Sequence, residues 1–159
     1  MNKPAPDAPS PVQDVFPYLC VRGAEAAIDF YANAFAAVEL FRIQEPGGRI
    51  GHAQLKLGPA VIMLSDEYPE HGINSPLKFG GTGVTIHLHV DNVDVLARQA
   101  VQHGATILME PTDQPHGERQ CRLQDPFGHV WLLGHEVEQV SPEEMKRRYD
   151  AQYAERTGS

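Results

Sequence analysis

Residues 84–104 have the sequence VTIHLHVDNVDVLARQAVQHG, and their pattern of apolar side chains changes once, at Asp91. Before that point apolar and polar residues alternate, as they do in a strand that is buried on one face. From Val93 onward the apolar residues follow the i, i+3, i+4, i+7 spacing of one helix face. Asp91 or Asn92 is placed to cap this helix, and Gly104 to end it. The stretch therefore predicts a strand followed directly by a helix.

The same order of elements occurs earlier in the chain, at an offset of 69 residues. In this register Val21 aligns with Val90, and residues 61–64 (VIML) align with residues 130–133 (VWLL). Each copy has the order strand, helix, strand, strand, strand, and alternation places the first strand at 15–21. Neither copy is large enough to bury a core alone, so we expect an α+β fold in which two βαβββ modules pack together around a cleft.

Turn-forming residues and helix signals set the expected boundaries. Ser141 opens a capping box with proline at the first helical position, which predicts a third helix without a counterpart in the first copy. The predicted organisation is a flexible Pro-rich tail at 1–13, a first module at 14–65, a linker at 66–82, a second module at 83–138 and a C-terminal helix at 141–155.

Composition excludes several classes of function. The chain has 21 acidic and 13 basic residues among 159, a net charge of −8, which disfavours binding to nucleic acid. No stretch approaches the length of a membrane span, so we expect a cytoplasmic protein without a membrane partner. Cys20 and Cys121 have no metal-binding or disulfide spacing and are expected to be free thiols. The unusual feature is the presence of eight histidines.

Two segments point to a known family: residues 27–31 (AIDFY) in the first helix, and residues 125–131 (DPFGHVW) before the last strand. With the repeat, they resemble the vicinal oxygen chelate superfamily, the group of glyoxalases, bleomycin resistance proteins and extradiol dioxygenases, and especially its uncharacterised PhnB-like branch. The resemblance covers about residues 14–140. It implies curved mixed sheets around a cup-shaped cavity, and a homodimer.

Metal-dependent members of that superfamily hold a divalent ion with four side chains. The resemblance places these positions at Phe16, Met63, Thr85 and Leu132. None of the four is a usual ligand for such ions, which take imidazole nitrogen or carboxylate oxygen. We therefore expect no metal at the family's position and no other cofactor.

Histidines on strands provide a second set of candidates. If Thr85 faces the cavity, alternation places His87 and His89 on the same face. They can hydrogen-bond a ligand or act as a general base. A relocated divalent metal held by His52, His87 and His89 is an alternative.

Other side chains suit ligand binding. Arg119 is a candidate clamp for an anionic or carbonyl group. The complete set of predicted ligand-binding residues is Phe16, Tyr18, Met63, Thr85, His87, His89, Leu132 and Arg119.

These observations favour a metal-free protein that binds a small, partly apolar molecule in an apolar cup between the modules. The competing hypothesis is an enzyme, a lyase, isomerase or dioxygenase, with relocated histidine ligands or with His87 or His89 as its base. A third hypothesis, a structural or interaction role, predicts that the protein's own side chains fill the cavity.

Overall fold

The computed structural model describes residues 11–157, so residues 1–10 of the predicted tail lie outside the described part of the chain. The first module is a four-stranded mixed sheet with one long helix. Its strands lie in the order β1-β4-β3-β2, with β1 and β4 parallel. In chain order its elements are β1 (Tyr18–Val21), α1 (Ala24–Phe35), β2 (Val38–Gln44), β3 (Ile50–Leu57) and β4 (Ala60–Asp66).

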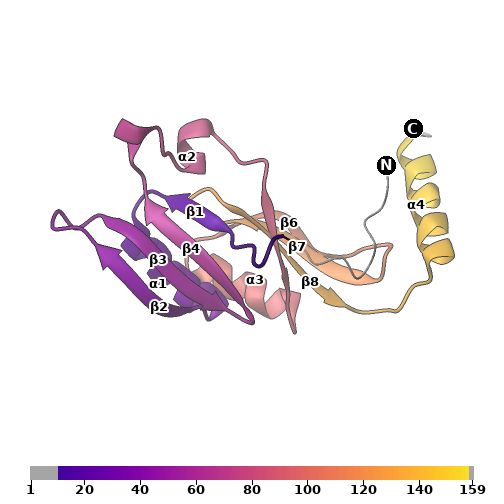
Figure 1. The fold of residues 1–159 in the computed structure, drawn as a ribbon. Coiled ribbons are helices and arrows are strands. Elements are labelled where there is room, and N and C mark those ends of the chain that lie inside the picture. The colour runs from indigo at the N-terminus through magenta and orange to yellow at the C-terminus, as the bar shows by residue number, and fades with distance from the viewer. Residues whose placement is uncertain (1–10, 158–159) are drawn as a thin grey trace.

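The second module repeats this arrangement. Its strands lie in the order β5-β8-β7-β6, with β5 and β8 parallel. Its elements are β5 (Thr85–His89), α3 (Val93–Gln102), β6 (Thr106–Asp113), β7 (Glu118–Gln124) and β8 (Val130–Glu136). The chain therefore folds as the predicted pair of βαβββ modules in an α+β protein, and the two sheets follow one another along the molecule (Figure 1).

The register of the two parallel strand pairs confirms the internal repeat. Tyr18 pairs with Met63 in the first module, and His87 pairs with Leu132 in the second. Each residue of the second pair lies 69 positions after its equivalent in the first. The offset found by aligning apolar residues is thus the offset of the hydrogen-bonded sheets.

The ends of the last strands also have equivalent roles. Asp66 Oδ1 accepts a 2.8 Å hydrogen bond from the backbone N–H of Ala24, at the start of α1. His135 Nδ1 accepts a 3.1 Å hydrogen bond from the backbone N–H of Val93, at the start of α3. In both modules a side chain from the last strand satisfies an N–H group that the helix leaves free.

The start of the first strand and the content of the linker differ from the sequence-based expectation. Strand β1 begins at Tyr18, later than the alternation from Val15 predicts, because Pro17 has no N–H to donate to a strand ladder. The linker contains two short helices, η1 (Pro69–His71) and α2 (Pro76–Phe79).

An aromatic cluster forms the centre of the core and joins the modules. The ring of Trp131 in β8 lies 4.9 Å from that of Phe35 and 5.4 Å from that of Tyr31, both in α1. Helices α1 and α3 also pack against each other. Because rings from both modules fill this space, neither module has a complete core alone.

The C-terminal helix α4 (Pro142–Thr157) lies at the end of the molecule far from the first sheet (Figure 1). Ser141 Oγ accepts a 3.2 Å hydrogen bond from the backbone N–H of Glu144, as the capping-box pattern predicts. Within residues 11–157, no helix is long and apolar enough to cross a membrane.

Candidate functional site

Each sheet has one face covered by a helix and one uncovered face, which we call the open face. Helix α1 packs against β3 and β4, and α3 packs against β7 and β8. The alternating side chains of each strand therefore divide into a buried set and an open set. Tyr18, Met63 and Leu132 belong to the open faces, since their strand neighbours Leu19, Leu64, Trp131 and Leu133 are buried. His87 also belongs to an open face, since its strand neighbours Ile86 and Leu88 are partly buried and pack against the core.

A cavity of about 450 Å³ lies between the segment that leads into β1 and the start of β5. Three of the predicted ligand-binding residues, Phe16, Tyr18 and Thr85, line it. The remaining lining residues are mostly apolar: Val15, Pro17, Leu19, Thr82, Val84, Ile86, His129 and Val130. The first strands of the two modules and the segments that lead into them thus border a partly open space of a size suited to a small ligand.

His129 helps to hold the two sides of this cavity together. Its Nε2 atom lies 2.9 Å from the carbonyl oxygen of Cys20 in β1. A carbonyl oxygen only accepts, so the imidazole donates this hydrogen bond.

His52 lies on the open face of the first sheet. Its Nδ1 atom is 2.7 Å from the hydroxyl oxygen of Tyr18, and its Nε2 atom is 3.3 Å from the amide nitrogen of Gln54. The ring of Phe41 lies 5.6 Å away on the other side. Burial raises the pKa of the Tyr18 hydroxyl. The contacts of His52 are thus with aromatic and amide groups of its own sheet.

His87 and His89 lie side by side on the open face of the second sheet, with ring centroids 6.4 Å apart. Glu118 of β7 is their carboxylate neighbour: its Oε1 atom is 3.6 Å from His89 Nε2, and its Oε2 atom is 3.5 Å from His116 Nε2. The hydrogen bond from Gln120, together with nearby His116 and His87, lowers the pKa of Glu118. An ionised carboxylate is thus surrounded by three imidazoles.

Gly134 makes room for this group. A Cβ atom at this position would lie 2.8 Å from His87 Nε2 and 3.2 Å from Glu118 Oε2. Gly134 is the β8 residue that pairs with both His89 and Gln120, so it forms the floor beneath the polar group.

His116 also connects the group to the C-terminal helix. Its Nδ1 atom is 3.1 Å from the hydroxyl oxygen of Tyr149 in α4, and the two rings are nearly parallel. The side chain of His116 is 23% exposed, although its position in a turn suggests a solvated residue.

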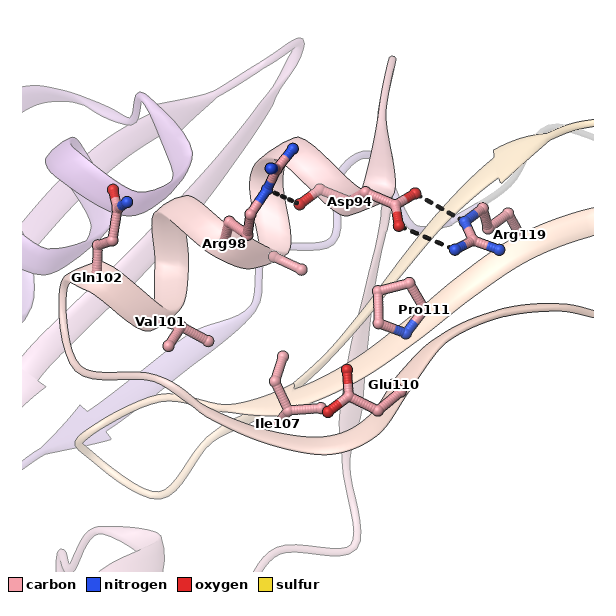
Figure 2. A pocket seen from close by; sticks show the side chains of 9 residues that line it. Asp94, Arg98, Val101, Gln102, Ile107, Glu110, Pro111 and Arg119 are labelled. Atoms are coloured by element: carbon pink, nitrogen blue, oxygen red, sulfur yellow. Dashed lines mark hydrogen bonds and ion pairs between the residues drawn. The ribbon is translucent and has the colours of Figure 1, made fainter.

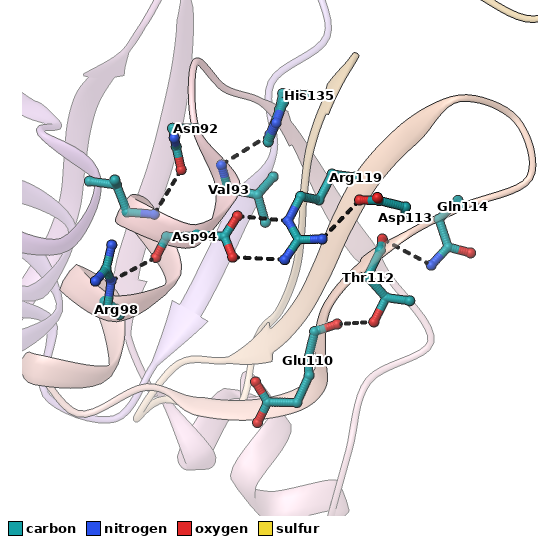
Figure 3. Close-up of polar contacts among 11 residues, drawn as sticks. Asn92, Val93, Asp94, Arg98, Glu110, Thr112, Asp113, Gln114, Arg119 and His135 are labelled. Carbon is teal, nitrogen blue, oxygen red and sulfur yellow. Dashed lines mark hydrogen bonds and ion pairs between the residues drawn. The ribbon is translucent and has the colours of Figure 1, made fainter. Parts of the chain in front are cut away.

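Arg119 lies on the opposite face of β7, toward α3. Its guanidinium makes two hydrogen bonds to Asp94, at 2.7 and 2.9 Å, and a third to Asp113 at 2.8 Å (Figure 3). The hydrogen bonds that Arg119 donates to the carboxylates of Asp94 and Asp113 raise the pKa of Arg119. The predicted anion clamp is therefore engaged with two carboxylates and is remote from the open face.

A second groove, of about 650 Å³, lies beside Arg119, between α3 and β6. Its apolar side chains include Val101 and Ile107, with Arg98 and Glu110 at its edges (Figure 2). It is on the helix side of the sheet, so it is separate from the cavity between the modules.

Arg122 is the arginine that β7 places on the open face. Its neighbours Cys121 and Leu123 are buried toward the helix, and its Nη2 atom donates a 3.2 Å hydrogen bond to Thr85 Oγ1. Sequence analysis missed Arg122, Glu118, Gln120 and His116. The sequence does contain a signal for Arg122. In a strand whose apolar residues are Cys121 and Leu123, alternation places Arg119 on the same face as this pair and Arg122 on the opposite, open face.

The four positions that the resemblance assigns to a divalent ion do not suit one. Phe16, Met63 and Leu132 offer no hard oxygen or imidazole nitrogen, and the Thr85 hydroxyl already accepts a hydrogen bond from Arg122. Among residues 11–157, no three His, Cys, Asp or Glu side chains are grouped in a way that could hold a metal ion.

Comparison with known proteins agrees with this architecture. A family model described as the Glyoxalase/Bleomycin resistance protein/Dioxygenase superfamily matches residues 13–133. An uncharacterized protein of Mycobacterium tuberculosis is 42% identical over 139 residues, which cover 86% of this chain and 82% of that protein. The crystal structure of TioX from Micromonospora sp. is 25% identical, with a TM-score of 0.62, and the match covers 79% of this chain and 100% of that one.

A gene product of Arabidopsis thaliana with an X-ray structure is also 25% identical, with a TM-score of 0.63 over 77% of this chain and 98% of that one. The family match extends from the segment before β1 into β8, so it includes both modules and the cavity between them. The chain therefore belongs to the glyoxalase/bleomycin resistance protein/dioxygenase superfamily.

Proposed function

We propose that this protein binds a small, partly apolar molecule in the cavity between its two modules, without the divalent ion of metal-dependent superfamily members. The observation that carries the proposal is the cavity itself, of about 450 Å³, with aromatic and aliphatic walls. Phe16, Tyr18 and Val84 are 44%, 53% and 68% exposed, so much of their apolar surface is available to a ligand. A ligand that covers this surface gains the free energy of removing it from water.

The probe for this proposal is N-phenyl-1-naphthylamine, a neutral aromatic molecule whose fluorescence rises when it leaves water. We expect saturable binding, weakened at least tenfold by Val84→Asp, which places a charge on the cavity wall. The matched control is Val101→Asp, which places the same charge in the groove between α3 and β6. Both side chains are partly exposed, so both variants are expected to fold.

Two results would overturn the proposal. One is the absence of saturable binding to the wild-type protein. The other is binding that Val101→Asp abolishes and Val84→Asp leaves unchanged, which would assign the ligand to the groove on the helix side.

A homodimer is the proposed assembly. Strand β2 is at the edge of the first sheet, and Val38, Leu40 and Ile43 on it are each at least 50% exposed. Apolar surface of this kind on a sheet edge favours contact with another protein surface. Native mass spectrometry and sedimentation should report a dimer that Ile43→Glu converts to a monomer; a wild-type monomer at high concentration would rule the assembly out.

A second function is favoured by one specific contact, that of Glu118 with His89. An imidazole that takes a proton from a ligand becomes a cation, and an ionised carboxylate 3.6 Å away stabilises that cation. In this function His87 or His89 is a general base, and Glu118 is a positioning residue.

The test uses 5-nitrobenzisoxazole, whose ring C–H proton passes to a base while the N–O bond breaks and a phenolate forms. We expect the rate with wild-type protein to exceed the rate with the His87→Ala/His89→Ala variant at least tenfold at pH 8. Glu118→Gln should reduce the rate while probe binding is unchanged. Equal rates for all three proteins would exclude the base function and leave the binding function in place.

A further inference from the structure

Arg122 differs from most arginines of this chain in its partners. Six others lie within 4.0 Å of a carboxylate: Arg22, Arg42, Arg49, Arg119, Arg147 and Arg148. Among residues 11–157, Arg122 has no such ion-pair partner, and its side chain makes the single hydrogen bond to Thr85. A guanidinium stays charged and has five N–H donors. Arg122 therefore retains both its charge and most of its donors for another molecule.

The position of Arg122 relates it to the cavity. The guanidinium reaches from β7 across β8 to the hydroxyl of Thr85 in β5, and Thr85 lines the cavity between the modules. The charge is thus at the edge of an apolar space whose other wall includes Phe16 and Tyr18.

The carboxylate nearest along the same face of β7 is that of Glu118. Glu118 and Arg122 are four positions apart on the strand, a distance of about 13 Å. This exceeds the screening length of about 8 Å at physiological ionic strength. Glu118 is also engaged with Gln120, His89 and His116 at its own end of the sheet. The open face of the second sheet therefore has a cationic end at the cavity and an acidic end away from it.

We propose that the ligand of this cavity is an apolar organic acid, whose aromatic or aliphatic body fills the space between the modules and whose carboxylate binds Arg122. The inference rests on the proposed binding function and adds the chemical class of the ligand. A guanidinium presents two parallel N–H groups that match the two oxygens of a carboxylate. The Thr85 hydroxyl, which accepts from Arg122, still has its own proton to donate to the same carboxylate.

The experiment is displacement of N-phenyl-1-naphthylamine by two competitors of almost the same shape, 2-naphthoate and its neutral amide, 2-naphthamide. We expect 2-naphthoate to displace the probe from wild-type protein at a concentration five- to tenfold lower than 2-naphthamide does. In Arg122→Gln this preference should disappear, while the affinity for the neutral probe is unchanged. Arg122→Lys, which keeps the charge but loses the two-pronged geometry, should retain part of the preference.

Arg98→Gln is the matched control, because Arg98 lines the groove on the helix side and has no side-chain carboxylate partner within 4.0 Å among the described residues. This variant should keep the full preference for 2-naphthoate. Raising the salt concentration should reduce the preference of wild-type protein and leave Arg122→Gln unaffected.

The outcomes separate this inference from the proposed function. If the neutral probe does not bind, the binding function is wrong. If the probe binds and wild-type protein shows no preference for 2-naphthoate, or if Arg122→Gln keeps that preference, the binding function stands and the organic-acid specificity is wrong.

Discussion

The hydroxyl of Tyr31 in α1 donates a 2.7 Å hydrogen bond to Oδ2 of Asp125, in the turn before β8. These residues belong to different modules, 94 positions apart in the chain. Trp131 Nε1 donates to the same oxygen at 2.8 Å, while Oδ1 accepts from two backbone N–H groups of the turn. Asp125 therefore connects the helix of the first module, the turn of the second and the aromatic core between them.

We expect Asp125→Ala to destabilise the protein by about 3 kcal/mol or more, because the buried Tyr31 hydroxyl and Trp131 N–H would both lose their acceptor. Tyr31→Phe removes one donor and leaves the carboxylate satisfied by the others, so it should cost only about 1 kcal/mol. Urea unfolding followed by Trp131 fluorescence measures the free energy of unfolding of both variants. Asp150→Ala is the control: Asp150 forms an exposed pair with Lys146, so this variant should have the stability of the wild type. Equal losses of stability in Asp125→Ala and Tyr31→Phe would contradict the central role of the Asp125 carboxylate.

Gly117 and Gly134, both in or beside the second sheet, have little space for a side chain. We nevertheless expect substitution by alanine to be tolerated better at one than at the other. At Gly117, with φ +89°, a Cβ atom would collide with the backbone oxygen of Glu138, which has no freedom to move away. Gly117→Ala should therefore cost about 2 kcal/mol or more. At Gly134 the nearest atoms are side-chain ends of His87 and Glu118, so Gly134→Ala should cost less in stability.

The distinguishing measurement for Gly134→Ala is the NMR spectrum of the histidine rings. The signals of His87 and His89 should shift, because the added methyl group displaces the imidazole above it. Unchanged ring signals, or a stability loss equal to that of Gly117→Ala, would be inconsistent with the observed packing.

Glu67 makes the stability of the fold depend on pH, and the direction of this dependence follows from its pKa. Hydrogen bonds from Arg22 and Ser75 lower its pKa from the ordinary 4.5 to about 2. A carboxyl group with a lowered pKa in the folded state stabilises the fold above pH 4.5, and that contribution is lost as the pH falls from about 4.5 to about 2. Ser75 is fully buried, so the hydrogen bonds to its N–H and hydroxyl are protected from water.

We therefore expect Glu67→Gln to lower the free energy of unfolding by about 1–2 kcal/mol at pH 7. The difference from wild type should shrink as the pH falls below 4.5, as followed by thermal unfolding across the pH range. Glu70→Gln is the control, since Glu70 and Arg49 form an exposed pair and should contribute little. If the difference in stability between wild type and Glu67→Gln grew as the pH fell, the predicted direction of the pH dependence would be wrong.

The two thiols should react at very different rates. Cys121 is fully buried, and its pKa is raised to about 11 by burial and by the nearby carboxylates of Glu110 and Asp94. Cys20 is partly exposed, and burial also raises its pKa. With Ellman's reagent at pH 8 we expect one slow reaction, lost in Cys20→Ser, and a second only after unfolding in urea. Two fast thiols in the native protein would contradict the placement of Cys121.

Most of the fold was predictable from local patterns. Strand β5 is followed directly by helix α3, as the pattern of residues 84–104 predicts, and the offset of 69 residues recurs in the pairing of Tyr18 with Met63 and His87 with Leu132. These features depend on residues close in sequence, whose spacing sets which face of an element is buried. The placement of His87 and His89 on one uncovered strand face followed from the same rule.

The sequence by itself thus determined the two modules, the faces of their strands, and the set of polar side chains from which a site can be built. The tertiary structure alone decided which of these side chains meet. Glu118 reaches His89 and His116 because β7 pairs with β8 and β8 with β5, and Arg122 reaches Thr85 for the same reason. Strand order and register across three strands arise from core packing between segments far apart in the chain. For that reason the spacing of residues along the sequence contains no direct signal for these contacts.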